Sequence, residues 1–419
     1  MTTQAGSAST PATPLTAAES DPATLEWMTG FPPSPDKAIT FADGSFRRFP
    51  QLRWAWSNVR QLVPTVQVWR GQGPVSVLPR NEQDLGRIAV TTMDGRQITF
   101  DQALAETYAD GIVVLHRGGI VFERYFGVLQ PHQPHIAMSV TKSFTGTLVG
   151  MLVAEGSIDP NAPVPTYVPE LAASAFGDAT VAQVMDMTTG LAYTEVYTDP
   201  QSGVWDLRRA NGMAPPVPGL APTSLLDFLT TQKKRGEHGR VFAYKTVNTD
   251  VLAWILRRVT GQSLSSLLST RIWQPMGAEE DAYYHVDRLG IESGGGGLNT
   301  TTRDLARFGE LMRNRGRFNG RQIVPAGVVD DIARGSDPAK FAPAGYATLP
   351  GWSYRNQWWV SHNAHGVYMA RGVHGQSIYV DPKAEMVIAR YASHHAAGNV
   401  ANDPVTLPAF MAVAKHLMG

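Results

Sequence analysis

The sequence predicts an α+β fold in which an antiparallel sheet is flanked by helices and interrupted by a mainly helical insertion. Strand-forming patterns lie near the two ends of the chain, at 112–125 and 366–392, and the patterns between them are mostly helical. Strands at both ends have apolar faces to bury. We therefore expect the two ends to form one sheet, with the helical region inserted between them.

These patterns divide the chain into four parts. They are a disordered tail (1–24), an extended N-terminal arm (25–82), an α/β domain in two segments (83–165 and 286–419) and a mainly helical domain (166–285). The tail is rich in Thr, Ala, Ser and Pro and lacks the basic start and apolar run of a signal peptide. The arm carries many aromatic residues among Pro and Gly without sustained periodicity.

Composition narrows the class of function. The chain has 419 residues, 43% of them hydrophobic and 17% charged, which suits a globular protein with a large core. Because 36 basic residues balance 36 acidic ones, we expect no binding to nucleic acid or an anionic membrane. The absence of cysteine excludes disulfides, thiol catalysis and thiolate metal sites. A cytoplasmic enzyme acting on small molecules is expected, and a homodimer is left open.

The first half of the chain contains a helix, a hairpin and a second helix. Thr99 is a predicted N-cap for a helix to Tyr108, and 112–125 reads as a hairpin that turns at a Gly-Gly pair. A capping-box pair, Thr180 and Gln183, opens the next helix after a Pro-rich stretch. These signals place strands before the helical insertion.

The second half is mainly helical before it returns to strands. Residues 193–222 have a loop-like composition. The predicted helices cover 223–232, 248–260, 264–273, 302–314 and 405–418. Three antiparallel strands are predicted at 366–371, 377–380 and 386–392, the last two joined by a turn at Asp381 to Lys383.

The helix from Ser139 to Gly156 carries the clearest chemical signal. Apolar residues recur at helical spacing from Phe144 to Leu152, so the helix is expected to be mostly buried. Ser139 would lie at its N-terminus, with Lys142 one turn later on the same side. A hydroxyl beside an amine, with free N–H groups of the helix start close by, is the layout of a Ser-x-x-Lys acyl-transfer nucleophile.

Spacing alone leaves an alternative open for this pair. Ser139 also suits an N-cap serine with a solvated lysine. A second match, Ser34 to Lys37, lies in a Pro-rich stretch with no helix after it and is interpreted as chance.

Two other motifs have ordinary structural explanations. Gly294 to Leu298 lacks the Lys-Ser/Thr that would follow a phosphate-binding loop, so a tight backbone crossing is expected. His362 and His365 have no obvious carboxylate ligand nearby and are interpreted as solvated rather than metal-binding. No metal or other cofactor is predicted.

The combination of motifs resembles the serine β-lactamase and D-alanyl-D-alanine peptidase superfamily. Within it, the chain is most similar to the 6-aminohexanoate-dimer hydrolases, which cleave nylon oligomers, and to family VIII carboxylesterases. The motifs that carry the resemblance are Ser139-Val-Thr-Lys142-Ser, Tyr244 with 248–254, Gly-Gly-Leu-x-x-Thr-x-x-Asp-Leu-Ala at 296–306, Gln357-Trp-Trp359 and His374-Gly-Gln. This implies a β-lactamase/transpeptidase-like fold.

The resemblance also implies catalytic roles. Ser139 would be the nucleophile, with Lys142 and Tyr244 as proton carriers. Unperturbed lysine and tyrosine titrate at about pH 10, so we expect each to lower the effective pKa of the other in a desolvated site. The backbone N–H groups of Ser139 and Val373 would form the oxyanion hole.

Four further residues are expected at the substrate. The resemblance implies that Tyr197 contacts the substrate amide and that Trp359 closes over the substrate, although ordinary aromatic packing is open for both. Where penicillin-recognising relatives carry Lys-Thr-Gly or His-Thr-Gly, this chain reads Ala370-Arg371-Gly372, so Arg371 either replaces the missing cation and binds a substrate carboxylate or is a surface strand residue. His374 is expected to order the pocket rather than to act as a base.

The expected activity is hydrolysis of linear amides of the 6-aminohexanoate oligomer type through a Ser-Lys-Tyr acyl-enzyme. Thr246 replaces the asparagine that penicillin-recognising relatives carry two residues after the tyrosine, and the Glu-x-x-Leu-Asn motif is missing, so β-lactams are disfavoured as main substrates. One alternative is a family VIII carboxylesterase with weak β-lactamase or peptidase side activity. Another is a non-catalytic ligand-binding relative.

Overall fold

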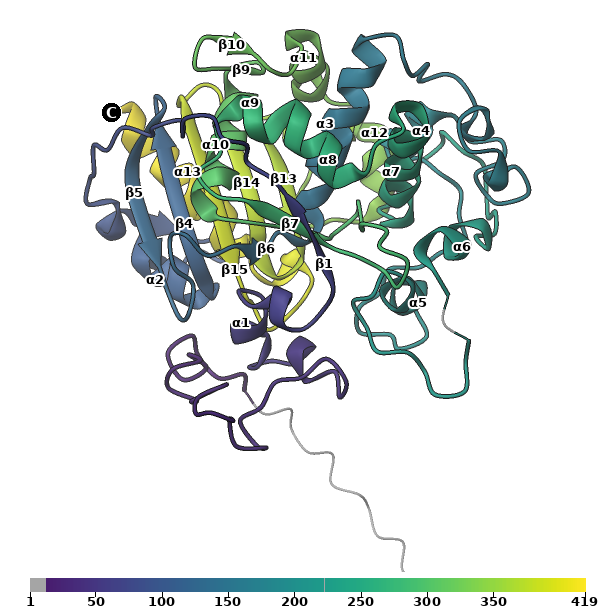
Figure 1. Ribbon diagram of the computed structural model, residues 1–419. Helices are drawn as coiled ribbons and strands as arrows, with labels where there is room; N and C mark the ends of the chain where they lie inside the picture. Colours follow the sequence, from purple (N-terminus) through teal and green to yellow (C-terminus); the bar gives the residue numbers. More distant parts are fainter. Residues whose placement is uncertain (1–12, 222) are drawn as a thin grey trace, which may run out of the picture.

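A seven-stranded antiparallel sheet forms the centre of the computed structural model, which describes residues 13–221 and 223–419 (Figure 1). The strand order is β11-β12-β13-β14-β15-β4-β5. These strands are β4 (Ala109–His116), β5 (Gly119–Tyr125), β11 (Ser353–Arg355), β12 (Trp358–Val360), β13 (Tyr368–Gly372), β14 (Gln376–Asp381) and β15 (Met386–Ala392). Because β15 pairs with β4, the prediction that both ends of the chain share one sheet is confirmed.

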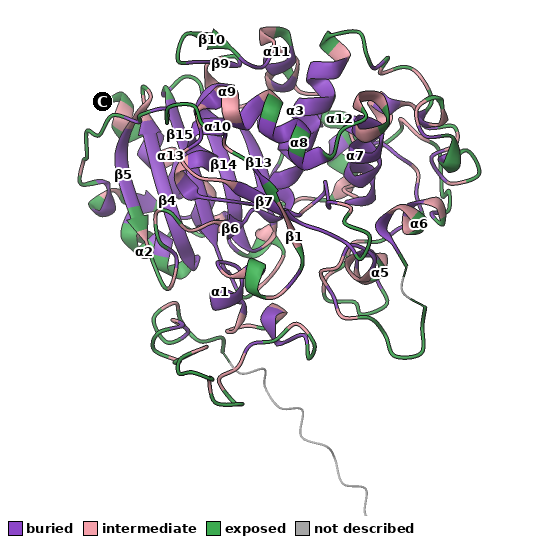
Figure 2. Ribbon diagram, in the orientation of Figure 1, coloured by how far each residue is buried: buried purple, intermediate pink, exposed green. Residues whose placement is uncertain are grey.

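The central strands are buried on both faces, which explains their continuous apolar runs. In β4, Ile112 and Val114 belong to a core with α2 (Phe100–Glu106) and α13 (Asp403–Met418). Val113 and Leu115 belong to a second core with α3 (Thr141–Ala154) and α10 (Thr302–Arg313). Successive strand residues point to opposite faces, so the sheet lies between two helical layers (Figure 2).

One of the smaller sheets connects the N-terminal arm to the body through β1. A four-stranded sheet has the order β1-β7-β8-β6. Its strands are β1 (Thr65–Val68), β6 (His135–Ile136), β7 (Ala282–His285) and β8 (Leu298–Thr300). Two short pairs are β2 (Ala89–Thr91) with β3 (Gln97–Thr99) and β9 (Arg317–Phe318) with β10 (Arg321–Gln322). Strand β7 lies inside the predicted helical domain, 166–285, and pairs with β1 and β8. The helical part of that domain therefore ends before Ala282.

The remaining helices cover the sheet and build the inserted region at the right of Figure 1. They are α1 (Leu52–Ala55), α4 (Val181–Met185), α5 (Gly203–Ala210), α6 (Leu225–Thr230), α7 (Val247–Thr260), α8 (Leu264–Leu268), α9 (Gln274–Met276), α11 (Ala326–Arg334) and α12 (Pro338–Phe341). The capping boxes predicted at Thr99 and Thr180 both form. In the described part of the chain, no helix has the length and apolar character needed to cross a membrane.

Two expectations from the sequence are wrong. Residues 13–24 are ordered, because Tyr108 donates a hydrogen bond to the Leu15 carbonyl at 2.7 Å and the Arg53 guanidinium donates to Ser20 Oγ at 2.9 Å. The rest of the predicted disordered tail, 1–12, lies outside the described residues. The 193–222 segment is not only loop, because its polar composition conceals the amphipathic helix α5.

Helix α3 is the buried axis of the molecule. Every residue from Thr141 to Leu152 is buried, between the sheet and α7. At Gly146 a Cβ atom would lie 2.6 Å from the Asn356 carbonyl oxygen and 2.7 Å from Gln357 Cβ. The helix that follows the predicted nucleophile is thus held against the loop before β12 at contact distance.

Replacing Gly146 by alanine should lower the free energy of unfolding by about 1–3 kcal/mol, because the added methyl group meets backbone that is fixed in the sheet layer. Urea unfolding measures this change. The matched control is Gly327→Ala in α11, where a Cβ meets nothing within 4 Å. There the better helix propensity of alanine should stabilise the protein by up to about 1 kcal/mol. Equal effects at both positions would contradict the close packing of α3.

Candidate active site

Ser139 lies in a 3₁₀ turn, Met138–Val140, immediately before α3. Its side chain is beside that of Lys142, whose Nζ donates a hydrogen bond to Ser139 Oγ at 3.0 Å. Lys142 Nζ also donates to the carbonyl of Gly295. The sequence placed Ser139 in the helix itself, whereas the structure places it one short turn earlier, with the same proximity to the amine.

The environment of Lys142 destabilises the charged, protonated form of its amine. Its side chain is 1% exposed, and this burial lowers its pKa to about 8. The negative charges of Glu195 and Asp250 act in the opposite direction, and Arg208 lowers the pKa further. An amine with a pKa near 8 is partly deprotonated at neutral pH, so it has a lone pair available to accept a proton.

The glycine run, Gly294 to Gly297, supplies one hydrogen-bond acceptor of the Lys142 amine. Gly295 accepts from Lys142, and its own N–H donates to Asp250 Oδ1 at 3.0 Å. A Cβ at Gly294 would lie 2.6 Å from that of Ala253 on α7. The predicted tight backbone crossing is therefore present, and it connects α7 to the amine.

Tyr244 completes the group. Its ring centroid is 5.2 Å from Lys142 Nζ, and the ring stacks on Trp359 with centroids 5.5 Å apart. Burial raises the pKa of the Tyr244 phenol well above its usual value, and a hydrogen bond with Ser139 only partly offsets this. The expectation that both pKa values are lowered is wrong for Tyr244, because desolvation acts on a phenolate as strongly as on an ammonium ion.

The end of β13 passes close to Ser139. A Cβ built on Gly372 would lie 3.0 Å from the Ser139 nitrogen and 2.9 Å from the Ala137 carbonyl oxygen. Only glycine allows this approach, and it brings the next residue, Val373, to the cavities that Ser139 lines. The two predicted oxyanion donors are thus on neighbouring segments.

The two aromatic residues predicted to contact the substrate line one cavity at Ser139. Tyr197 and Trp359 line a cavity of about 240 Å³ together with Ser139 and Tyr244. Trp359 is 6% exposed and also packs edge-on against Tyr354 at 5.3 Å. It forms a wall of the cavity in this structure.

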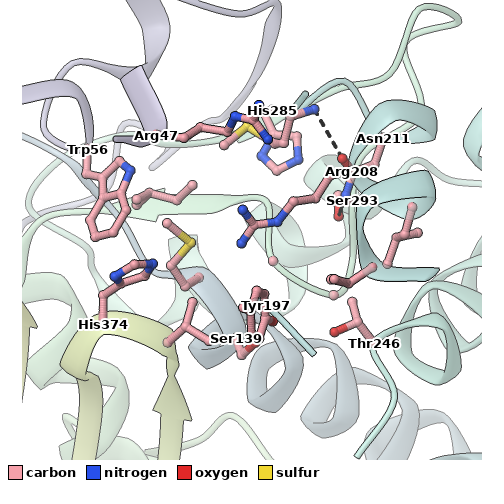
Figure 3. Close-up of a pocket in the computed structure, with 18 of the residues that line it drawn as sticks. Arg47, Trp56, Ser139, Tyr197, Arg208, Asn211, Thr246, His285, Ser293 and His374 are labelled. Carbon is pink, nitrogen blue, oxygen red and sulfur yellow. Dashed lines mark hydrogen bonds between the residues drawn. The ribbon is translucent and has the colours of Figure 1, made fainter. Parts of the chain in front are cut away.

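Arg371 and His374 are both engaged by the protein. Arg371 lines the same cavity as Ser139 but forms a buried ion pair with Asp403, so it is not the surface strand residue of the alternative, and its charge is already compensated. His374 Nδ1–H donates a hydrogen bond to the His394 carbonyl at 2.7 Å, and its ring packs edge-on against Trp56 with centroids 4.3 Å apart (Figure 3). Burial lowers its pKa to about 3, so it is neutral at pH 7.

Sequence reasoning missed Glu195. Its carboxylate accepts hydrogen bonds from Thr246 N–H and Thr246 Oγ1, both at 2.8 Å, and from the Tyr197 hydroxyl at 2.7 Å. It therefore connects the 193–222 segment to the start of α7. The only signal in the sequence was Thr246, where relatives carry asparagine.

The histidines considered for metal binding have other partners. His365 Nδ1 lies 2.7 Å from Asp381 Oδ2, and His362 Nε2 lies 2.7 Å from Ser353 Oγ. Among the residues that the structure describes, no group of three or more His, Asp or Glu side chains is arranged to hold a metal ion.

The fold and the site together define a class of protein. A serine at the start of a buried helix, a desolvated lysine one turn later and an antiparallel sheet edge beside them are the parts of a serine hydrolase that acts on amide or ester bonds. The chain belongs to the beta-lactamase family, whose sequence pattern matches residues 99–405.

The comparisons place the chain on one branch of that family. It is 37% identical over 350 residues to the 6-aminohexanoate-dimer hydrolase of Paenarthrobacter ureafaciens, covering 83% of this chain and 87% of the relative. A solved structure of a candidate 6-aminohexanoate-dimer hydrolase from Bacillus anthracis superposes with a TM-score of 0.84 at 34% identity, covering 92% and 98%. A family VIII carboxylesterase shares the fold, with a TM-score of 0.53 at 18% identity over 75% and 96%. The resemblance and the fold predicted from the sequence are confirmed.

Proposed function

We propose that the chain hydrolyses linear amides through an acyl-enzyme on Ser139, with Lys142 and Tyr244 as the proton carriers. The observation that carries this proposal is the 3.0 Å contact between Ser139 Oγ and Lys142 Nζ in a site where burial lowers the amine pKa to about 8. The name of the 37% identical relative supports 6-aminohexanoate oligomers as the substrate class.

The pKa of Lys142 is lowered and that of Tyr244 is raised, which supports Lys142 as the base and Tyr244 as the acid in acylation. Neutral Lys142 accepts the Ser139 proton as Oγ attacks the carbonyl carbon, and the N–H groups of Ser139 and Val373 receive the oxyanion. Tyr244, protonated at rest, donates its proton to the leaving nitrogen as the C–N bond breaks. The Lys142 ammonium then returns a proton to the Tyr244 phenolate, so the free base is restored.

Deacylation uses the same base. Lys142 accepts a proton from the water that attacks the ester carbonyl carbon of the acyl-enzyme, and it returns this proton to Ser139 Oγ as the C–O bond breaks. The carboxylic acid product leaves the site. One desolvated amine can serve both half-reactions, because in each it accepts a proton from an oxygen nucleophile, first the Ser139 hydroxyl and then water.

The shape of the cavity supports a slender substrate. The cavity of about 240 Å³ is lined by the aromatic side chains of Tyr197, Tyr244, Trp359 and Tyr346. Aromatic walls of this kind pack against methylene groups, while the Tyr197 hydroxyl and the backbone N–H groups provide polar contacts for an amide. Arg371 contributes a wall and not a free charge, because Asp403 pairs with it.

Replacing Ser139 by alanine should abolish amide turnover and remove labelling by a serine-directed phosphonate, because the attacking oxygen is lost. Intact-mass measurement after phosphonate treatment reads out the adduct, and an acyl adduct should accumulate on wild-type protein with a poor substrate. Ser34→Ala, at the other Ser-x-x-Lys match, is the control and should label fully. A label that persists in Ser139→Ala would refute the assignment of the nucleophile.

Replacing Tyr244 by phenylalanine should lower kcat/KM for an amide by about 10²–10⁴-fold, the usual contribution of a positioned proton donor. A p-nitrophenyl ester of the same acyl group should lose much less, because its leaving group needs no proton. Tyr354→Phe is the matched control, since that hydroxyl is buried without a hydrogen-bond partner near Tyr244. Equal losses for amide and ester would contradict the role of Tyr244 as proton donor to the leaving group.

A further inference from the structure

Two arginines face a second, small cavity beside Ser139. Arg47 and Arg208 both line it, together with Ser139, Tyr197 and Val373 (Figure 3). Its volume is about 70 Å³, room for a few water molecules or one small polar group. Within the described residues no aspartate or glutamate lines it, in contrast to the larger cavity, which Glu195 and Asp403 line.

Local structure explains why the two guanidinium groups meet there. On α5, the buried residues Val204 and Leu207 set the inner face, and Arg208 follows directly on the side of the cavity. Arg47 ends a 3₁₀ turn of the N-terminal arm, Ser45–Arg47. The arm, which has no catalytic group, thus completes the wall of a cavity that reaches Ser139.

Neither guanidinium group forms an ion pair with a described acidic residue, and none of these residues lines the cavity. In the described part of the chain, the contacts of both guanidinium groups are with aromatic rings: Arg208 lies 5.2 Å from the ring centroid of Tyr197 and 5.0 Å from that of Trp205, and Arg47 lies 5.3 Å from the latter. Arg47 Nε is buried and has no hydrogen-bond partner among the described residues. A buried donor without an acceptor is costly, so this atom indicates a missing ligand.

The arrangement is electrostatically unfavourable when the cavity holds no anion. Burial lowers the pKa of Arg47, and the nearby charge of Arg208 lowers it further. The two histidines of the cavity add no negative charge, because burial lowers the pKa values of His285 and His374 to about 3 and keeps both neutral. Both ring nitrogens of His285 lack hydrogen-bond partners in residues 13–221 and 223–419, so its N–H is a further donor for a ligand.

We infer that Arg47 and Arg208 bind a carboxylate of the substrate in this cavity, so that the enzyme prefers linear amides that end in a free acid. Planar guanidinium groups bind carboxylates bidentately, and a carboxylate fits the small volume. This inference rests on the proposed function and gives these two residues a role that the sequence left open for Arg371, whose charge Asp403 already neutralises.

The preference is measured as a ratio of kcat/KM for matched amides. One member of each pair ends in a carboxylate and the other in a carboxamide, and two pairs place this end on the acyl half or on the amine half. Wild-type enzyme should favour the carboxylate member of at least one pair by about tenfold or more, as expected for a charge-assisted hydrogen bond. The ratio cancels any effect of a variant on Lys142.

Arg208→Gln and Arg47→Gln should each reduce that ratio towards one, mainly through KM, and Arg208→Lys should retain part of it. The matched control is Arg209→Gln: this neighbour on α5 pairs with Asp206 and does not line the cavity, so the ratio should not change. A wild-type ratio near one for both pairs, or ratios that survive both glutamine variants, would overturn the inference while leaving the proposed hydrolase intact.

Failure of the proposed function has a different signature. If no amide or ester is cleaved and no phosphonate adduct forms, calorimetric titration with adipate, a linear dicarboxylate, tests the cavity directly. Binding to wild-type protein that is at least tenfold weaker in Arg208→Gln would support the anion site. Equal binding in both proteins, or none to the wild type, would refute it.

Discussion

The proposed chemistry depends on the burial of one amine. Lys142 Nζ is removed from water by α3, α7 and the glycine run, and its closest polar contacts are neutral oxygens of Ser139 and Gly295. A carboxylate in direct contact would hold the proton on the amine, whereas Asp250 and Glu195 act only from a distance. Partial deprotonation near neutral pH is thus built into the fold.

The rest of the fold maintains this burial. Gly146 allows α3 to pack against the loop before β12, Gly294 allows the crossing with α7, and Gly372 allows β13 to pass beside the Ser139 nitrogen. Each position has no room for a Cβ, so three separate segments are fixed around one helix start. The sheet that joins both ends of the chain supplies the rigid support for this arrangement.

Most of this arrangement was predictable from the sequence, because its elements carry local signals. Strong periodicity and capping residues indicated the hairpin, α2, α3 and the C-terminal strands. Motif spacing indicated Ser139 and Lys142, and the family resemblance added Tyr244. The contacts of charged side chains were not predictable. Nothing near Arg371 in the sequence points to Asp403, and Arg47 and Arg208 are 161 positions apart and meet only through the fold of the arm and α5.

NMR can measure directly whether burial lowers the pKa of Lys142. Protein labelled with ¹³Cε-lysine gives one resonance per lysine side chain, and the Lys142 signal is identified by its loss in Lys142→Met. If burial lowers the Lys142 pKa, this resonance should titrate with a midpoint near pH 8, with the free base present above it. A midpoint at the ordinary lysine value of about 10.4 or higher would contradict the account, because the amine would then hold its proton when Ser139 attacks.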